Sequence, residues 1–435
     1  MPYDIVIGRD PADKEKFGEK GLIYLGKGYV KMGNYTSLSN KIYMDIARSH
    51  VIMIAGKRGS GKSYSIGVIA EELSNLPQET AKNIAPIIFD TMGIFWTMKY
   101  KNEKDAALLK NWDLKSKNLP VKVFVPYGKA SEYKEKNIPF DNSFAIEASE
   151  LDAEDWLSIF NLEIITPIGV LIERAISKLK ENLLSFNITS IQKEIESDPK
   201  ASNDKKEIAS ALFSAAESWG IFAKDKGTKI IDLINAGTTT VLDISVYSSI
   251  SLFNVRALVI SLISRKLFKS RLDARKKEEL ESIHHGREYL SYKTTRDQPL
   301  IWIFLDEAHE FLTREGKTPA TDALIQILRE GRQPGISLVL ATQQPGQIHK
   351  DVMTQSDIVI SHKLTAKADL DALNEIMQSY IPESIKKQMD SLPPLKGSAI
   401  ILDDNSERIY PVRIRPRSTW HGGEAPSAVK AEIQI

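Results

Sequence analysis

Runs of consecutive apolar residues recur along the chain and alternate with longer segments of helical periodicity. The clearest runs are "HVIMIAG" (50–56), "NIAPIIFDT" (83–91), "VKVFVPYG" (121–128), "GTTTVLDIS" (237–245), "PLIWIFL" (299–305), "GISLVLATQQ" (335–344) and "DIVISHKL" (357–364). Strands that are buried on both faces have this pattern, which is typical of parallel sheets covered by helices. The chain therefore predicts an α/β fold with a central, mostly parallel sheet.

Amphipathic helical patterns dominate residues 145–235. They are "AEDWLSIFNL" (153–162), "PIGVLIERAISKLKENLLSF" (167–186) and "DKKEIASALFSAAESWGIF" (204–222), with the polar linker "IESDPKASNDKK" (195–206) between the last two. Because strand patterns lie on both sides, we expect a helical insertion within one α/β domain. A further long helix is expected over 252–283, with a charged and solvated C-terminal half, followed by an exposed loop at 284–298.

The first residues predict a small β module of short strands, "YDIVIG" (3–8), "GLIYLGKGYVKMG" (21–33) and "NKIYMDI" (40–46), with a charged turn at 10–20. The whole pattern predicts five parts: an N-terminal β module (1–48), the first part of the core (49–144), the helical insertion (145–235), the second part of the core (236–415) and an extended C-terminal strap (416–435).

Composition excludes several classes of site. The chain of 435 residues has no cysteine, which excludes disulfides, zinc sites with thiolate ligands and a cysteine nucleophile. Its formal net charge is only +1, so any basic surface must be local. No apolar stretch approaches 18 residues and the first residues have no apolar signal core, so we expect a cytoplasmic protein that does not itself span a membrane.

Residues 56–63, "GKRGSGKS", match the phosphate-binding P-loop pattern between a buried strand and a helix. Glycines let the backbone amides turn toward the phosphates, and the positive end of the helix points at the same anion. Lys62 is expected to reach the β and γ phosphates and Ser63 to bind Mg²⁺. The predicted ATP contacts are Gly56, Lys57, Arg58, Gly59, Ser60, Gly61, Lys62, Ser63 and Tyr64.

A P-loop needs a metal-binding acid and a group that orients water. Asp306 ends the strand "IWIFL" and is expected to hold Mg²⁺, and Glu307 follows where it can orient the attacking water. The letters "DEAH" also occur in a class of helicases whose two motifs lie much closer together. Asp306 lies about 240 residues beyond Lys62, so that class is rejected.

The segments "LDEAHEFL" (305–312), "REGRQPGISLVLATQQP" (329–345) and "RPRSTWHGGEAP" (415–426), together with the P-loop, resemble the HerA/FtsK family of ring-forming DNA motors. The resemblance implies a RecA-like core in a homohexamer, with ATP and Mg²⁺ between subunits and double-stranded DNA in the pore. It implies that Arg332 is an arginine finger for the neighbouring subunit's ATP, with Arg329 as a helper. Gln343 matches the polar residue that senses the γ-phosphate.

The loop "LTREGKTP" (312–319) occupies the position of the family's pore loop, so Arg314 and Lys317 are expected to contact DNA phosphates. Asp90 matches an acidic strand end of the family. Trp96 and Lys99 are candidates for contact with a neighbour's nucleotide, while His284 and His285 are expected to be surface residues.

The expected function is an ATP-dependent translocase or helicase for double-stranded DNA, acting in end processing, DNA transport or defence. HerA proper has an N-terminal β-barrel larger than the module predicted here, and a NurA-like nuclease is the expected partner of such a motor. Two alternatives stay open: a motor for DNA import or conjugation docked on a membrane channel made by other proteins, and a nucleotide-switched assembly protein for a nuclease that does not translocate.

Overall fold

The computed structural model describes residues 3–32, 35–247, 253–377, 385–424 and 428. Its centre is a sheet of thirteen strands within these ranges. Neighbouring strands in the order β11 (Ile358–His362), β4 (Val51–Ala55), β10 (Ile336–Thr342), β9 (Leu300–Leu305), β5 (Ile84–Asp90), β8 (Thr239–Asp243), β6 (Val121–Pro126) and β7 (Asn142–Phe144) are all parallel. The predicted α/β fold with a mostly parallel sheet is confirmed.

The N-terminal strands extend this same sheet. β11 continues through antiparallel β12 (Ser398–Asp403), β13 (Arg408–Ile414) and β2 (Leu22–Met32) to β3 (Tyr35–Asp45), and β1 (Ile5–Ile7) closes the edge. The close pairing of β2 with β13 requires a glycine, since a Cβ on Gly26 would lie 2.2 Å from the carbonyl oxygen of Arg413. The predicted turn at 10–20 is wrong: α1 (Pro11–Phe17) forms there, with Pro11 at its first position, where a missing N–H costs nothing.

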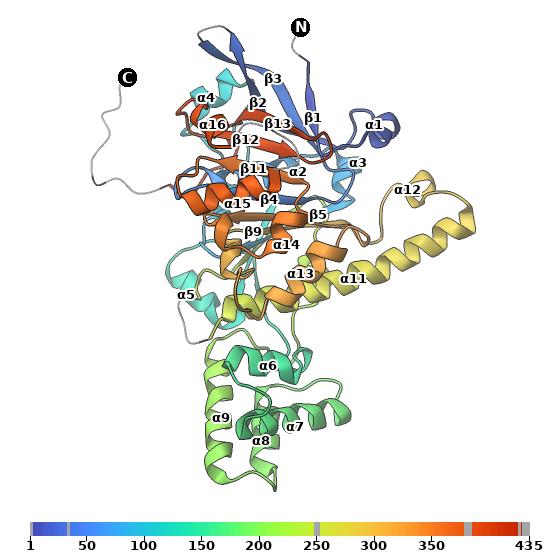
Figure 1. The fold of residues 1–435 in the computed structure, drawn as a ribbon. Helices are drawn as coiled ribbons and strands as arrows, with labels where there is room; N and C mark the ends of the chain where they lie inside the picture. Colours follow the sequence, from blue (N-terminus) through green and yellow to red (C-terminus); the bar gives the residue numbers. More distant parts are fainter. Residues whose placement is uncertain (1–2, 33–34, 248–252, 378–384, 425–427, 429–435) are drawn as a thin grey trace.

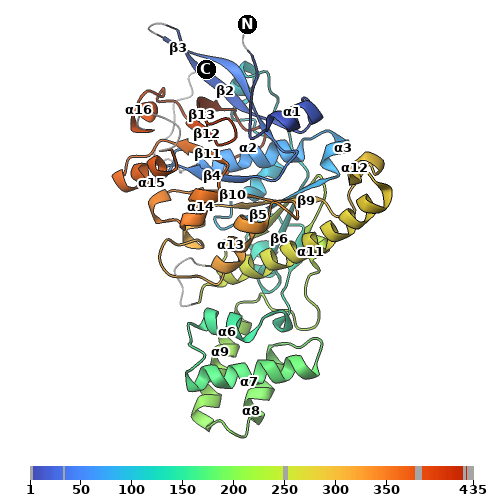
Figure 2. The same cartoon turned by 45° about the vertical axis from the view of Figure 1, so that its right-hand side comes forward.

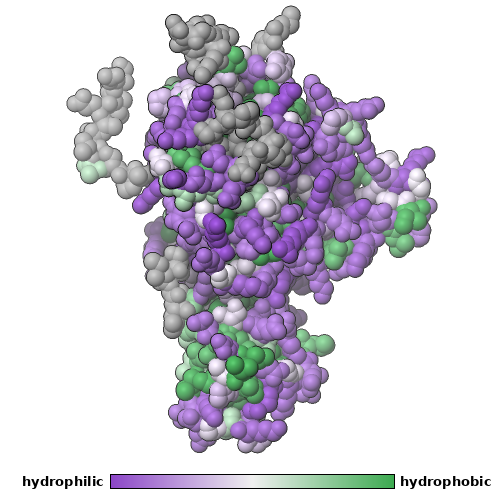
Figure 3. All heavy atoms as spheres, viewed as in Figure 1, coloured by the Kyte–Doolittle hydropathy of each residue, from purple (hydrophilic) through white to green (hydrophobic). Residues whose placement is uncertain are grey.

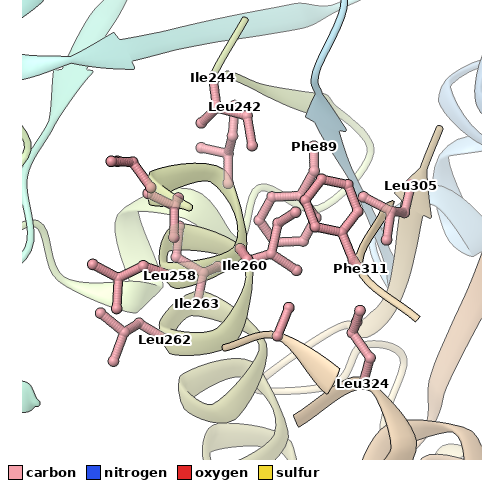
Figure 4. Packing of buried hydrophobic residues seen from close by; sticks show 14 of the residues in the cluster. Phe89, Leu242, Ile244, Leu258, Ile260, Leu262, Ile263, Leu305, Phe311 and Leu324 are labelled. Carbon is pink, nitrogen blue, oxygen red and sulfur yellow. The ribbon is translucent and has the colours of Figure 1, made fainter. Parts of the chain in front are cut away.

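Two apolar layers cover the sheet, because successive residues of a buried strand face opposite sides. On β4, Ile52 and Ile54 pack with α2 (Lys62–Ser74), whereas Met53 and Ala55 join the layer that contains α11 (Val255–His285). Figure 4 shows the second layer, with Phe89 and Leu305 of the sheet facing α11.

Short helices connect the strands of the sheet. They are α3 (Gln78–Ala81), η1 (Phe95–Lys99), α4 (Ala106–Asn111), η2 (Tyr127–Lys129), α5 (Ala130–Glu135), η3 (Ala148–Glu150), η4 (Ala308–Glu310), α13 (Thr321–Glu330), η5 (Pro345–Gln347), α14 (Lys350–Gln355), α15 (Lys367–Met377) and α16 (Ile385–Asp390).

A helical lobe stands between β7 and β8, at the lower end of Figures 1 and 2. It consists of α6 (Ala153–Phe160), α7 (Pro167–Asn182), α8 (Ile188–Ser197) and α9 (Asn203–Ser218), after which α10 (Ile230–Leu233) contacts α11. Trp156 is fully buried at its centre, with its ring 4.8 Å from that of Phe213. The sequence did not predict α8, whose N-terminus is capped by the Asn187 side chain.

The long helix α11 differs from its prediction in one half. Its first half is buried in the core, as the apolar pattern indicates, and its second half extends away from the sheet with α12 (Tyr289–Tyr292) at its end (Figure 1). That second half is not simply solvated, because Arg271 and Glu278 are buried. The predicted loop at 284–298 contains α12, whose Tyr289 is also buried.

Apolar side chains gather in two places on the face shown in Figure 3, on the helical lobe and near α12. Those of Ile165, Leu184 and Ile283 are among the most exposed. Within the described ranges, no helix combines the length and the apolar character needed to cross a membrane.

Candidate nucleotide-binding site

The P-loop joins the end of β4 to the start of α2, at the carboxyl edge of the parallel sheet. The amide of Gly56 donates to the carbonyl oxygen of Thr342 at the end of β10, 3.3 Å away. A Cβ on Gly56 would lie 2.4 Å from Ser60 Oγ, and Gly61 has a φ of 118°, a conformation that favours glycine. The loop is thus a glycine-dependent cradle at the N-terminus of a thirteen-residue helix, which suits an anion.

The predicted phosphate contacts lie along this loop. Gly59 also has a positive φ, and the side chains of Lys57 and Arg58 are exposed. Lys62 is buried within the first turn of α2, and Tyr64 follows it.

His362, which sequence reasoning missed, packs against the P-loop. His362 ends β11, is fully buried, and lies within 3.4 Å of where a Cβ on Gly61 would stand. Burial, helped by the charge of Lys62, lowers the pKa of His362 to about 4, so the ring is neutral. Its Nδ1 lies 3.1 Å from the carbonyl oxygen of Ser398 and must carry the proton, which leaves Nε2 to accept from Ser65 Oγ at 2.8 Å.

The structure brings the predicted metal-binding pair together. Ser63 Oγ donates to Asp306 Oδ2 at 2.5 Å, although the two residues are far apart in sequence. Asp306 is buried, which raises the pKa of its carboxyl group. Among the described residues no cluster of three or more His, Cys, Asp or Glu could hold a metal. One hydroxyl and one carboxylate beside a phosphate cradle nevertheless fit Mg²⁺, which usually takes few protein ligands and completes its shell with phosphates and water.

Glu307 occupies an unusual position directly after Asp306. It has a φ of 51°, in the left-handed region that non-glycine residues rarely adopt. Its amide donates to Asp306 Oδ1 at 2.9 Å, and its buried Oε2 has no hydrogen-bond partner among the described residues. Burial and the neighbouring charge of Asp306 raise the pKa of Glu307 to about 7. The left-handed turn therefore presents the Glu307 carboxyl group beside the cradle, with its Oε2 3.6 Å from Nδ1 of His309.

Gln343 lies at the same edge, because it follows β10, which pairs with β4. Next to it, Thr342 is buried, and its Oγ1 lies 3.2 Å from Nδ1 of His309. The ends of β4, β9 and β10 thus bring the P-loop, Asp306 and Gln343 to one edge of the sheet.

Arg332 lies at the opposite edge, because it precedes β10 while the P-loop follows the parallel strand β4. Its side chain is exposed and makes no hydrogen bond or ion pair within the described residues. Arg329 instead pairs with Asp351, 2.6 Å away. The chain does not place Arg332 near its own P-loop.

The predicted pore loop is partly engaged in local contacts. Arg314 donates from Nη1 to the carbonyl oxygen of Gly346 at 3.0 Å, and Lys317 pairs with Asp322 at 2.9 Å. The Lys317–Asp322 pair is strongly exposed and contributes little to stability, so Lys317 can exchange Asp322 for another anion. The side chain of Arg314 is also exposed.

The other candidates have structural partners. Asp90 is buried and accepts from the amides of Gly93 and Phe95, each at 2.7 Å, while burial and the nearby Asp243 raise its pKa to about 7. Lys99 pairs with Asp141 at 2.6 Å. The indole of Trp96 donates to the carbonyl oxygen of Gly93 at 3.0 Å.

The C-terminal strap, described to residue 424 and at 428, crosses the face of α2. Glu71 of that helix is buried and accepts from Arg415 and Arg417, each at 3.0 Å, and from the amide and hydroxyl of Thr419. The amide of Arg417 also donates to the hydroxyl of Tyr64 at 2.6 Å. The strap therefore fixes the helix that carries the phosphate cradle.

Comparison with known proteins gives consistent matches. The family model described as "Helicase HerA, central domain" matches residues 30–267, and the one described as "Helicase HerA-like C-terminal" matches residues 288–401. The probable helicase MJ1565 of Methanocaldococcus jannaschii is 23% identical over 412 residues, which are 92% of this chain and 69% of that protein. The DNA double-strand break repair helicase HerA of Saccharolobus solfataricus is 22% identical over 405 residues, 90% of this chain and 69% of that protein.

Among solved structures, VirB4 of Thermoanaerobacter pseudethanolicus superimposes with a TM-score of 0.54, covering 92% of this chain and 98% of that chain. At 12% sequence identity this likeness concerns the fold alone.

Proposed function

The chain belongs to the HerA helicase family, and on that premise we propose that it is an ATP-hydrolysing motor that moves double-stranded DNA through a ring of identical subunits. The observation that carries the proposal is the division of the catalytic groups between two edges of the sheet. The cradle, Asp306 and Glu307 lie at one edge and Arg332 at the other, which supports a site completed by two copies of the chain.

The groups at the carboxyl edge support in-line attack of water on the γ-phosphate of ATP. Lys62 neutralises charge on the β and γ phosphates, and Glu307 accepts a hydrogen bond from the attacking water and orients it. Ser63 and Asp306 would hold Mg²⁺, which when bound neutralises phosphate charge. Gln343, which follows β10 at the same edge, would sense the γ-phosphate.

Arg332 completes the site from the neighbouring copy. A guanidinium offers a planar pair of donors to phosphate oxygens and stays charged at any working pH. It would stabilise the charge that spreads over the transferring phosphoryl group. A homohexamer repeats this arrangement at every interface, so each subunit acts once as the binding side and once as the arginine donor.

The DNA contact is assigned to the loop at 312–319, directly after the catalytic turn. Arg314 and Lys317 would meet phosphates in the channel, and ring symmetry multiplies each cation sixfold in a hexamer. Phosphate contacts carry no base information, so sequence preference should be weak.

Mixed rings test the shared site. Lys62→Ala should abolish ATP hydrolysis, and Glu307→Gln should bind ATP but hydrolyse little of it. Arg332→Ala should lower the rate of ATP hydrolysis by up to about three to five orders of magnitude. Because Glu307→Gln subunits keep Arg332 and Arg332→Ala subunits keep Glu307, rings mixed from these two inactive variants should recover DNA-stimulated ATP hydrolysis.

The control is a ring mixed from Lys62→Ala and Glu307→Gln subunits, which lack the same side of the site and should stay inactive. Recovery in the control, or none in the test mixture despite proven co-assembly, contradicts the shared site. Turnover that is indifferent to duplex DNA contradicts the motor function.

A further inference from the structure

We propose that Arg271 is a positioning residue that sets Arg332 for the nucleotide of a neighbouring copy of the chain. This inference rests on the proposed function, because it concerns the arginine that completes the shared site. Arg271 lies near the middle of α11, far in sequence from the loop that it holds.

Arg271 bonds directly to the backbone that carries Arg332. Its Nε donates to the carbonyl oxygen of Pro334 at 2.9 Å, two residues after Arg332. Its Nη1 donates to the carbonyl oxygen of Gln298 at 2.8 Å, just before β9. One guanidinium thus bonds both to the Arg332 loop and to the segment just before β9, the strand that Asp306 follows.

The loop that carries Arg332 is a tight turn held by its own backbone hydrogen bonds. The amides of Gly335 and Ile336 donate to the carbonyl oxygen of Gly331, at 3.2 and 2.8 Å. Gly335 has a φ of 86°, and a Cβ there would lie 2.4 Å from Cδ2 of Leu300 and 3.6 Å from Nη2 of Arg271. The turn therefore fits closely against Arg271 and the start of β9.

Arg271 lies in a buried charged network, which is costly to remove from water. The side chain of Arg271 is 0% exposed and its counter-ion Glu278, 3.1 Å away, only 3%. Glu278 also pairs with Arg296, so one carboxylate serves two guanidinium groups. Apolar residues of similar volume often stabilise a fold as well as or better than such a buried network. The guanidinium adds something that a methionine could not supply, namely directed bonds to two backbone carbonyl groups.

Arg332 borders a cleft at its own edge of the sheet. Arg332 lies on the wall of a cleft of about 1590 Å³, bounded by α1, the second half of α11 and α12. The cleft opens at the edge of the sheet opposite the P-loop. Exposed Ile283 and Leu290 of the α11–α12 end also line it, where Figure 3 shows an apolar group near α12.

The experiment uses Arg271→Met in the full-length ring. Displacement of a catalytic group by about 1 Å can lower a rate about a hundredfold. We expect kcat for ATP to fall by about tenfold to a hundredfold, with KM little changed because Lys62 and Ser63 are untouched. The double variant with Arg332→Ala should be no slower than Arg332→Ala alone, since both changes remove the same contribution.

Mixed rings separate positioning from general damage. Arg271→Met subunits mixed with Glu307→Gln subunits should recover activity, as the Arg332→Ala mixture does, because each Arg271→Met subunit still has an intact binding side. Arg271→Met mixed with Arg332→Ala should not recover, since neither subunit type then donates a well-placed arginine. A merely structural defect would damage the binding side too and give no recovery with Glu307→Gln.

Arg265→Met is the matched control, because Arg265 lies on the same helix and pairs with Asp155 of the helical lobe at 2.8 Å, away from the Arg332 loop. It should keep wild-type kcat. If Arg271→Met forms no rings, the same measurements are made on Arg271→Lys. A lysine keeps the charge beside Glu278 but cannot bond both carbonyl groups with a fixed fork, so kcat should again fall.

Wild-type kcat in the Arg271 variant, or failure of its rings with Glu307→Gln to recover, overturns the positioning role while leaving the shared site intact. Wild-type turnover of Arg332→Ala itself would instead overturn the proposed function.

Discussion

His50 should stabilise the fold only while it carries a proton. It precedes β4 and is buried between two carboxylates, with Nδ1 at 2.5 Å from Asp357 Oδ2 and Nε2 at 3.2 Å from Asp45 Oδ2. Arg9 also bonds Asp45 through Nε at 2.6 Å, and Asp403 adds its charge near Asp357. The cluster joins the N-terminal strands to the parallel sheet.

Burial alone would lower the pKa of His50, but the charges and hydrogen bonds of Asp357 and Asp45 outweigh it and raise the pKa to about 9. An unfolded histidine has a pKa of about 6.5, so the difference corresponds to about 3 kcal/mol of folding free energy. Because the folded pKa is the higher one, this stabilisation is fully present below about pH 6.5 and disappears as the pH rises through about 9.

The measurement is urea unfolding of the wild type and of His50→Gln at pH 6 and pH 9.5. Glutamine cannot carry the charge, so the two free energies of unfolding should differ by about 3 kcal/mol at pH 6 and by little at pH 9.5. His284→Gln is the matched control, because His284 is an exposed histidine and should give the wild-type pH dependence. An equal difference between wild type and His50→Gln at both pH values would refute the assignment of a buried imidazolium.

Two further predictions concern the strap and the pore loop. Glu71→Gln removes the buried counter-ion of Arg417 and leaves Arg415 with only Glu72, so it should lower the free energy of unfolding by about 3–5 kcal/mol, measured by urea unfolding, and expose the strap to limited proteolysis. Glu79→Gln, at an exposed position of α3, should do neither. Alanine at both Arg314 and Lys317 should reduce the salt dependence of duplex binding by about one slope unit per lost phosphate contact and uncouple DNA from ATP turnover, while basal hydrolysis survives. An unchanged salt slope with full DNA stimulation would place the DNA contact elsewhere.

The sequence predicted those features that depend on local spacing. Buried parallel strands give continuous apolar runs, so the central strands and the place of Asp306 at a strand end followed from pattern alone. The P-loop is equally local, because its glycine spacing sets the backbone turn. The meeting of Ser63 with Asp306 then needed only the rule that parallel strands share a carboxyl edge.

Local pattern did not reveal contacts that form only in three dimensions. "DIVISHKL" predicted a strand, but nothing in it indicated that His362 would lie beneath the P-loop. The strands β12 and β13 were not predicted either, although they join the N-terminal module to the sheet. The charged turn predicted at 10–20 is instead α1, in which Pro11 takes the first position, where its fixed φ suits a helix and its missing N–H is not needed.

Buried charge is the hardest feature to predict, because charged residues are almost never fully buried unless they are paired, and pairing is tertiary. Arg415 lies 344 residues from Glu71, and Arg271 lies 63 residues from Pro334. A charged helix therefore indicates a solvated face, which is wrong at Arg271 and Glu278. One of these two buried networks clamps the last turns of α2, the helix that begins at Lys62, and the other holds the loop that carries Arg332. If a site is completed between copies, both of its halves need such anchoring, since an error in either one misplaces the arginine against the phosphate.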